Sequence, residues 1–228
     1  MRYIYCHPLF DERKCAHRFS YQLRKAFEKN GLLLEQFDYH GTGEAEGQFC
    51  DVTMDSLKND LQQIIGNDRV CLIGTRLGAT VAFDFCCQEQ SIVQTLILVE
   101  PVINGPSYTE YLFRKQHLKD ILTGNCSRVT NRDGFFNLEG YKTNSIFLEQ
   151  IKHLHFNEVV DRIKTEAIFI IQISFSSRIN TEYDLLVECL KRNGIPASIE
   201  VFNLPVFWER IPESDYSGAI EKIVEWCQ

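Results

Sequence analysis

Short apolar runs alternate with amphipathic, helix-like stretches along most of this chain of 228 residues. Strands separated by helices favour parallel pairing with right-handed crossovers. The pattern therefore predicts an α/β fold, a doubly wound and mostly parallel six-stranded sheet. The predicted strands are 2–6, 32–37, 70–73, 95–99, 167–173 and 197–202. The predicted helices are 17–30, 54–65, the stretch up to 88, 181–193 and 214–226.

The third predicted strand runs into the segment Gly74-Thr75-Arg76-Leu77-Gly78, which precedes a helical pattern. A G-x-z-x-G spacing between a strand and a helix is typical of a nucleophile elbow, a sharp turn that presents a reactive side chain. The central residue of that motif is serine or another nucleophile. Here it is Arg76, whose guanidinium cannot attack a carbonyl carbon.

Charge and composition exclude several classes of function. The chain has 24 basic and 31 acidic residues, and its net charge of -7 argues against non-specific nucleic-acid binding. The longest clear apolar run, 167–171, is too short for a membrane span, and charged residues interrupt the first apolar positions as they would not in a signal peptide. Nine cysteines without a CxxC motif indicate free thiols in a reducing compartment. We expect a cytoplasmic protein without a metal or a cofactor.

Residues 103–157 interrupt the regular alternation. They contain two helix-like stretches, a polar segment and two aromatic clusters: Tyr108, Tyr111 and Phe113, and Phe135, Phe136 and Tyr141. An excursion on the carboxyl side of a parallel sheet is where a lid would lie, although an ordinary helical crossover with a long loop is the alternative. We expect one domain, 1–228, with 103–157 as a lid.

Motifs outside the elbow add a family resemblance. The first strand ends in CHPLFDE and the second in FDYHGTGEAEG, where α/β-hydrolases carry an oxyanion loop and a D-x-x-G-x-G loop. The chain resembles the α/β-hydrolase superfamily over nearly its whole length, without the two amino-terminal strands that many hydrolases carry. The segments HPLFDERKCAHR, GTRLGA, EPVINGPSYTEYL, LEGY and VFWE resemble the exosortase A system-associated hydrolases, a group that includes proteins with arginine at the elbow.

The resemblance implies a position for each strand. The order would be 32–37, 2–6, 70–73, 95–99, 167–173 and 197–202, with a reversal of direction that opens a ligand-binding crevice beside the third strand. Arg76 and the helix that begins at Leu77 would form the floor of this crevice. The loop from His7 to Glu12 would form one wall and Glu100 the other.

A serine-hydrolase triad is not expected in this chain. Such a triad needs a nucleophile, a histidine base after the sixth strand and an acid after the fifth. The loop after the sixth strand reads NLPVFWERIPES, which has no histidine. After the fifth strand only Glu182 or Asp184 is available, and both are late for the acid.

Arg76 has two possible kinds of partner. Burying its charge unpaired would cost several kcal/mol, so a negative group must lie nearby. Glu12 or Glu100 would provide an internal ion pair. Alternatively, a ligand carboxylate, phosphate or thioester would bind the guanidinium and the helix N–H groups. The two arrangements are compatible.

The remaining candidate side chains have simpler alternatives. His7 faces the pocket or packs within its loop, and Trp208 covers the crevice or belongs to the core. His153 and His155 would face apart on a helix, which makes a poor metal site.

Three classes of function remain. The first is a non-hydrolytic relative that binds a small anionic or acyl-type ligand at the elbow. The second is an ester or thioester hydrolase with Arg76 as electrostatic stabiliser and a water activated by Glu12 or His7. The third is a scaffold for a protein partner. The sequence favours the first.

Overall fold

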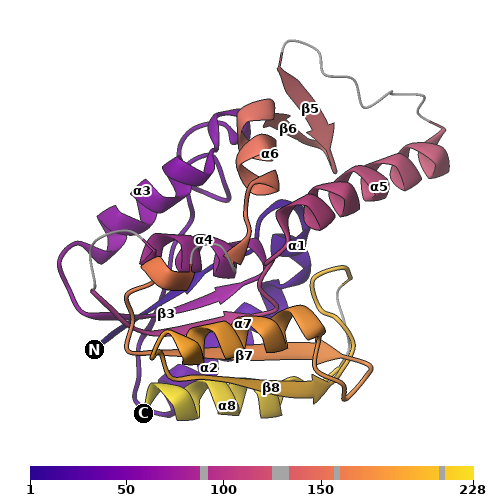
Figure 1. Ribbon diagram of the computed structural model, residues 1–228. Helices are drawn as coiled ribbons and strands as arrows, with labels where there is room; N and C mark the ends of the chain where they lie inside the picture. Colours follow the sequence, from indigo (N-terminus) through magenta and orange to yellow (C-terminus); the bar gives the residue numbers. More distant parts are fainter. Residues whose placement is uncertain (88–91, 125–133, 157–159, 211–213) are drawn as a thin grey trace. The chain divides into compact units, whose positions relative to one another are not determined.

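The computed structural model describes residues 1–87, 92–124, 134–156, 160–210 and 214–228, and its ribbon is drawn in Figure 1. The chain forms two compact units. The sheet unit contains 1–37, 65–101 and 156–228, and the insert unit contains 38–64 and 102–155. The insert unit is therefore built from two excursions, which follow the second and the fourth strand of the sheet along the chain.

The sheet unit has the predicted architecture. Its strands are β1 (Arg2–Cys6), β2 (Leu34–Gln36), β3 (Val70–Thr75), β4 (Val93–Val99), β7 (Ala167–Ser174) and β8 (Ala197–Asn203). They pair in the order β2-β1-β3-β4-β7-β8, and every neighbouring pair is parallel. The six-stranded parallel sheet and the strand order that the resemblance implied are both confirmed.

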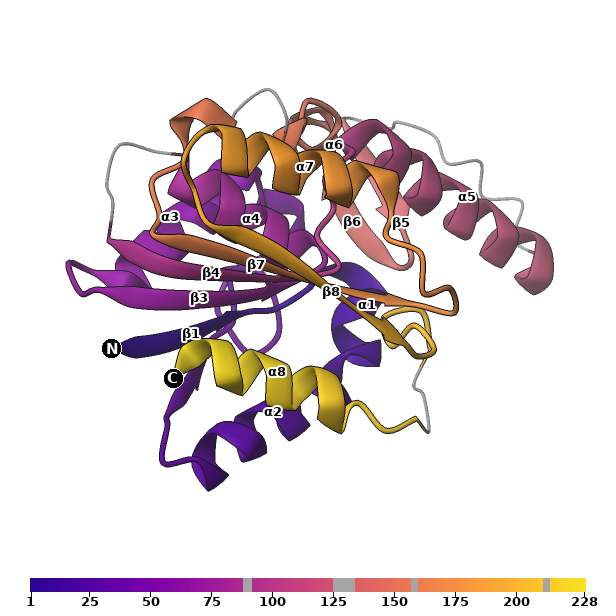
Figure 2. The same ribbon diagram turned by 60° about the horizontal axis from the view of Figure 1, so that its bottom comes forward.

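Helices cover both faces of this sheet. They are α1 (Phe10–Cys15), α2 (His17–Lys29), α4 (Leu77–Cys86), α7 (Thr181–Arg192) and α8 (Ser217–Cys227), with a short 3-10 helix η3 (Val160–Arg162). Figure 2 shows α2 and α8 side by side on one face, and α4 and α7 on the other. This is the two-sided covering that a buried parallel sheet requires.

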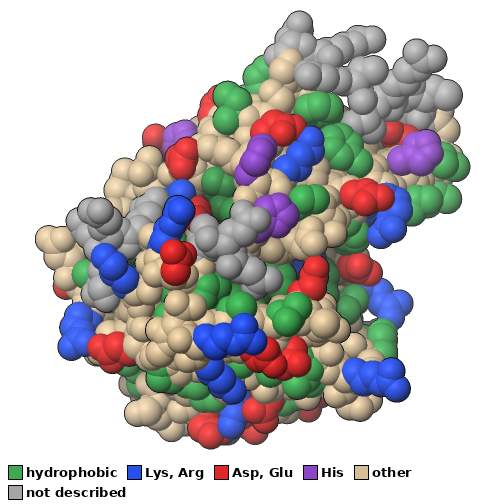
Figure 3. Space-filling model, in the orientation of Figure 1, with side chains coloured by type: hydrophobic (Ala, Val, Ile, Leu, Met, Phe, Trp, Pro, Cys, Tyr) green, Lys and Arg blue, Asp and Glu red, His purple; other side chains and the backbone are tan. Residues whose placement is uncertain are grey.

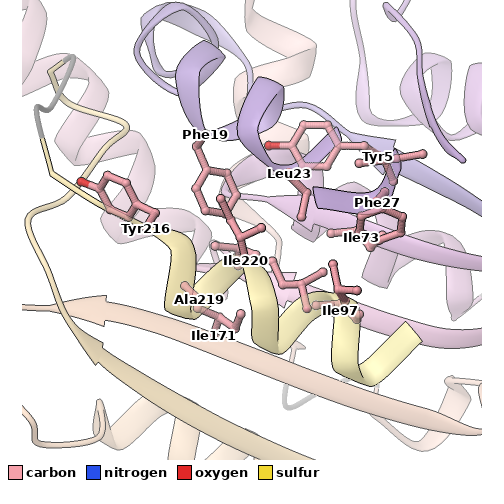
Figure 4. Packing of buried hydrophobic residues seen from close by; sticks show 14 of the residues in the cluster. Tyr5, Phe19, Leu23, Phe27, Ile73, Ile97, Ile171, Tyr216, Ala219 and Ile220 are labelled. Atoms are coloured by element: carbon pink, nitrogen blue, oxygen red, sulfur yellow. The ribbon is translucent and has the colours of Figure 1, made fainter. Parts of the chain in front are cut away.

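The core on the α2 and α8 face follows from the two-residue period of the strands. Alternate residues of the central strands, such as Ile73 and Ile97, point to this face and are fully buried. Phe19 and Leu23 of α2 and Ile220 of α8 pack against them (Figure 4). Because each of these large side chains is removed from water, this layer contributes strongly to stability.

Several boundaries differ from those predicted. Residues 7–12 were expected to form a loop, but α1 begins at Phe10, so Glu12 lies on a helix. The third strand continues to Thr75, two residues past the predicted end, because its backbone keeps pairing with β4. The second strand is shorter than predicted, and the last helix begins at Ser217 rather than 214.

The insert unit has its own secondary structure. It contains η1 (Phe49–Asp51), α3 (Met54–Ile65, whose last residue belongs to the sheet unit), α5 (Gly105–Thr123), the antiparallel hairpin β5 (Phe135–Leu138) and β6 (Tyr141–Asn144), and α6 (Ser145–Lys152). The Asn144 amide joins the two excursions, because its Nδ2 donates to the carbonyls of Cys50 and Val52 at 2.7 Å each. The hairpin was not predicted. Most of the polar segment expected near 123–134 lies outside the described residues, and a lid role for 103–157 stays a prediction.

Two further observations concern the charges on the surface and the length and apolarity of the helices. Figure 3 shows Lys and Arg side chains interspersed with Asp and Glu over the part of the sheet unit that contains α7. Among the helices that the structure describes, none is both long enough and apolar enough to cross a membrane.

Candidate functional site at the elbow after strand β3

The backbone of the elbow is sharply bent at Arg76. This residue has φ 53° and ψ -126°, directly between β3 and α4. A side chain other than glycine in this region costs on the order of 1–3 kcal/mol, and such strain is concentrated at functional sites. Two other non-glycine residues of the sheet unit with positive φ, Phe10 and Glu100, also follow the carboxyl ends of strands. The strain is therefore gathered at one edge of the sheet.

The two glycines of the motif allow this turn because the chain passes very close to them. A Cβ on Gly74 would lie 2.4 Å from the Cα of Ala79. A Cβ on Gly78 would lie 2.3 Å from the carbonyl oxygen of His7 and 2.4 Å from that of Cys6. The G-x-z-x-G spacing is thus required by packing of α4 against β3 and against the end of β1.

The Arg76 side chain is held on three sides. Its Nε and Nη2 each donate to Oε1 of Glu12 at 3.2 Å, and Nη1 donates to the backbone carbonyl of Glu100 at 3.2 Å. The guanidinium carbon lies 4.7 Å from the centre of the Trp208 ring, a distance at which a cation is attracted to the aromatic face. The arginine side chain is 13% exposed, while that of Glu12 is fully buried.

Glu12 forms an ion pair with Arg76, whereas the hydrogen bond from Arg76 to Glu100 goes to the backbone carbonyl. Glu12 reaches the guanidinium because α1 begins two residues after Pro8 and turns this carboxylate inward. A carboxylate this deeply buried would be very costly without a cation beside it. The two side chains therefore stabilise each other, as one of the sequence alternatives predicted.

The backbone carbonyl of Glu100 accepts a hydrogen bond from Arg76, and its side chain accepts one from the neighbouring strand β7. Its Oε1 accepts from the Ile173 N–H at 2.6 Å, and its Oε2 lies 3.1 Å from the Tyr183 hydroxyl. That hydroxyl also lies 3.0 Å from the Pro101 carbonyl. One hydroxyl hydrogen cannot fully serve both acceptors, but a protonated Glu100 can donate to Tyr183 while Tyr183 donates to Pro101.

Burial sets the ionisation of Glu100. It raises the pKa of this carboxyl above its ordinary value of 4.5, and the positive charge of Arg76 lowers it by less. Burial also raises the pKa of the Tyr183 hydroxyl. Burial thus shifts the ionisation of Glu100 toward the neutral acid, whereas Glu12 is the carboxylate in the ion pair with Arg76.

Replacing Glu100 by glutamine should flatten the pH dependence of stability. A carboxyl with a raised pKa in the folded state stabilises the protein at low pH, and this contribution is lost as the pH rises from about 4.5 through the folded-state pKa. Glutamine imitates the protonated acid at every pH. We expect Glu100→Gln to unfold at a higher urea concentration than the wild type at pH 8 and at a similar one at pH 4.5. A variant that is less stable than the wild type at pH 8 would show that the carboxylate form is required.

Trp208 occupies the region where the resemblance implied a histidine base. It follows β8, is 5% exposed, and lies against the guanidinium of Arg76. The adjacent Phe207 is fully buried and stacks on Phe19 of α2, with ring centres 4.2 Å apart. Trp208 therefore takes part in both expected roles, since it covers the elbow and belongs to the core cluster.

His7 and Leu77 are placed beside the elbow. The His7 ring meets the Tyr5 ring edge to face at 4.7 Å, and the Tyr5 hydroxyl bonds the Thr75 hydroxyl at 2.9 Å. Thr75 is fully buried, so it is not presented as a replacement nucleophile. Leu77 is buried as the first residue of α4, where the sequence predicted only that a helix begins.

The other triad candidates do not converge on Arg76. Glu182 and Asp184 are both exposed on α7, whereas Tyr183 between them points inward to Glu100. Among the described residues, no group of three or more His, Cys, Asp or Glu side chains is arranged to hold a metal ion.

The structure brings Arg76, Glu12, Trp208 and the backbone of Glu100 together, and it adds Tyr183, which the sequence analysis missed. A signal for Tyr183 was present: it is the aromatic residue between two acidic ones at the start of an amphipathic helix. Its inward position follows from the helical period, which buries Tyr183 with Leu186, Val187 and Leu190.

Solved structures with this fold come from esterases, lipases and other hydrolases. One is Est1E from Butyrivibrio proteoclasticus with ferulic acid bound, at a TM-score of 0.67 and 11% identity, covering 100% of this chain and 88% of that one. A monoacylglycerol lipase from Paleococcus ferrophilus matches with a TM-score of 0.66 and 15% identity, covering 98% of this chain and 92% of that one. Alpha/beta hydrolase domain-containing protein 10 from mouse matches with a TM-score of 0.62 and 13% identity, covering 99% of this chain and 88% of that one. At these identities the likeness establishes the α/β-hydrolase fold and nothing finer. A scan against protein-family models and a search of curated protein sequences each find no match.

Proposed function

We propose that this α/β-hydrolase fold is non-hydrolytic and binds a small anionic or acyl-type ligand in the crevice at the elbow. In this proposal Arg76 is a fixed, charged part of the crevice floor, and its pairing with Glu12 holds it in one orientation. The finer resemblance to exosortase A system-associated hydrolases, which rests on sequence segments alone, is part of the same proposal.

One observation carries the non-hydrolytic part. The positions of the nucleophile and of the histidine base are taken by Arg76 and Trp208, which lie in contact with each other at 4.7 Å. Neither side chain can form an acyl intermediate or accept a proton from a nucleophile at neutral pH. The chain also has no histidine after His155, so no imidazole base follows β7 or β8 in the sequence.

The proposal that an anionic ligand binds is supported by the chemistry of the groups at the floor of the crevice. A guanidinium is a planar cation that suits carboxylate and phosphate groups, and 13% of the Arg76 side chain remains exposed. Helix α4 begins at the next residue with no acidic side chain in its first turn, so its positive end also favours an anion.

Two other functions are weighed against this proposal. A hydrolase with unusual residues would need Glu12 or His7 to activate a water, but Glu12 is fully buried and ion-paired. A scaffold for a protein partner gains support from that same ion pair, because Glu12 and the Glu100 carbonyl already satisfy much of the guanidinium. A scaffold is therefore the second candidate.

Soaking experiments distinguish a ligand-binding protein from a scaffold for a protein partner. Crystals would be exposed to small carboxylates, phosphates and acyl thioesters, and the difference density around Arg76 compared with that of untreated crystals. An anion against the guanidinium and the start of α4 supports the binding proposal. An unchanged site after every soak would contradict it and favour the scaffold.

Arg76→Ser should not create an esterase. The new hydroxyl would lie at the elbow, where the loop after β8 supplies Trp208 and no imidazole. We expect the variant to hydrolyse p-nitrophenyl acetate no faster than the wild type, measured from the release of p-nitrophenol. Because this change leaves Glu12 buried without its cation, Glu12→Gln is combined with it to keep the protein folded. Clear turnover by the double variant would reveal a base that the proposal excludes.

A further inference from the structure

A second feature of the sheet unit lies where α1 and α2 meet. There the structure contains a cavity of about 320 Å³, lined by His7, Arg13, Lys14, His17 and Ser20. Its size falls within the range of small-molecule sites, at the lower end. Its lining residues are different from Glu12, Glu100 and Trp208, which contact the guanidinium of Arg76, although His7 lies beside the elbow.

Two of the residues that line this cavity are permanently charged, and both are cations. Arg13 and Lys14 are cations, and the two imidazoles can each donate an N–H. The described lining residues include no carboxylate, although acidic residues outnumber basic ones by 31 to 24 in the whole chain. A concave surface lined by one sign of charge concentrates ions of the opposite sign. The cavity is therefore suited to an anion.

The local fold explains how these side chains come together. Ala16 ends α1 and also begins α2, so the two helices follow one another without a loop and bring residues 13 and 17 to one junction. Helix α2 has no acidic residue in its first turn, and no side chain caps it. The Ser20 hydroxyl donates to the His17 carbonyl at 2.9 Å, which fixes the first turn.

The carboxylate of Asp11 competes with a ligand for Lys14, but weakly. Asp11 lies 3.0 Å from Nζ of Lys14, whose side chain is 71% exposed. Exposed ion pairs of this kind contribute little to stability, so a better anion can replace the carboxylate. A doubly charged group has an advantage over a single carboxylate here, because both Arg13 and Lys14 line the same cavity.

We propose that this cavity binds the phosphate group of a small phosphorylated molecule. Arg13 and Lys14 neutralise the charge, and the imidazoles of His7 and His17 donate hydrogen bonds. The cavity volume leaves room for an organic part attached to the phosphate. This proposal does not rest on the function proposed for the elbow, although His7 lies beside both sites.

The test is a calorimetric titration of the whole protein at pH 7 and fixed ionic strength with inorganic phosphate and with glycerol 3-phosphate. Saturable binding of at least one of them is expected. Arg13→Gln combined with Lys14→Gln should weaken it at least tenfold. The matched control is Arg24→Gln with Lys25→Gln, which removes the same charge from the exposed side of α2 and should change affinity less than twofold. His17→Gln is a milder variant, expected to weaken binding severalfold.

Three results would overturn the proposal. The first is no saturable binding of either phosphate compound to the wild type. The second is equal weakening in the two double variants, which would indicate a general effect of net charge. The third is acetate binding as tightly as phosphate. Should the Arg13 and Lys14 double variant fail to fold by circular dichroism, an unchanged affinity in His17→Gln would also contradict the proposal.

Discussion

Glu12→Gln is expected to lower the free energy of unfolding by about 3–5 kcal/mol. The Glu12 side chain is fully buried, and its Oε1 accepts from both Nε and Nη2 of Arg76. Glutamine has nearly the same shape but no charge, so the guanidinium would lose the carboxylate that it pairs with. The measurement is urea unfolding followed by circular dichroism. Other parts of the fold should be preserved, because the change adds no atoms that need space.

A control at an exposed pair shows whether burial is the cause. Glu166 lies 2.6 Å from Nη2 of Arg69, and both side chains are more than 60% exposed. Because solvent screens such pairs, Glu166→Gln should leave the unfolding midpoint almost unchanged. A midpoint that moves equally little in Glu12→Gln would contradict the buried ion pair.

Gly78→Ala should destabilise the protein by about 3 kcal/mol, because the added methyl group has no space. Its Cβ would lie 2.3 Å and 2.4 Å from two backbone carbonyl oxygens at the end of β1. Neither oxygen can turn away as a side chain could, so α4 would have to separate from the sheet. This loss exceeds the gain of about 0.5–1 kcal/mol that alanine normally brings to a helix.

Gly218→Ala is the matched control for this substitution. Gly218 also lies in a helix, α8, and the nearest atom to an added Cβ is a Phe202 ring carbon at 3.6 Å. That is an ordinary contact, so this variant should be no less stable than the wild type, and more stable by about 0.5 kcal/mol. Thermal unfolding of the two variants compares them directly. Equal stability of Gly78→Ala and the wild type would mean that the elbow is not packed as described.

The strand order could be predicted from the sequence for a physical reason. The buried strands read as short apolar runs, and the helices between them leave few ways to connect parallel strands. The elbow was predictable as well, because Gly74 and Gly78 are required by close backbone contacts that no larger residue allows. The spacing of these two glycines also identified Arg76 as the central residue of the elbow.

The partners of Arg76 were harder to predict, because they depend on distances between strands. Glu12 and Glu100 flank β3 from both sides, and the sequence alone does not decide between them. The decision depends on α1, whose six residues are too few for a clear periodic signal. It also depends on the hydrogen bonds of the Glu100 carboxyl, which involve the Ile173 N–H of β7 and the Tyr183 hydroxyl of α7.

The strained backbone at Arg76 is compensated locally. Its N–H donates to the Val99 carbonyl at 3.0 Å, and its own carbonyl accepts from the Thr80 N–H at 3.2 Å. These bonds fix the turn from both ends, and the ion pair with Glu12 fixes the side chain. An elbow built in this way holds the guanidinium in one place, as the proposed binding role requires.

The most direct test of this account is a double-mutant cycle between Glu12 and Arg76, measured by urea unfolding. The variants are Glu12→Gln, Arg76→Met and the two changes combined. If the residues act as one buried pair, each single change leaves an unpaired group and the double change removes both. The stability lost in the double variant should then be smaller than the sum of the single losses by about 2–3 kcal/mol. Additive losses would contradict the account, because they would mean that Glu12 and Arg76 contribute separately.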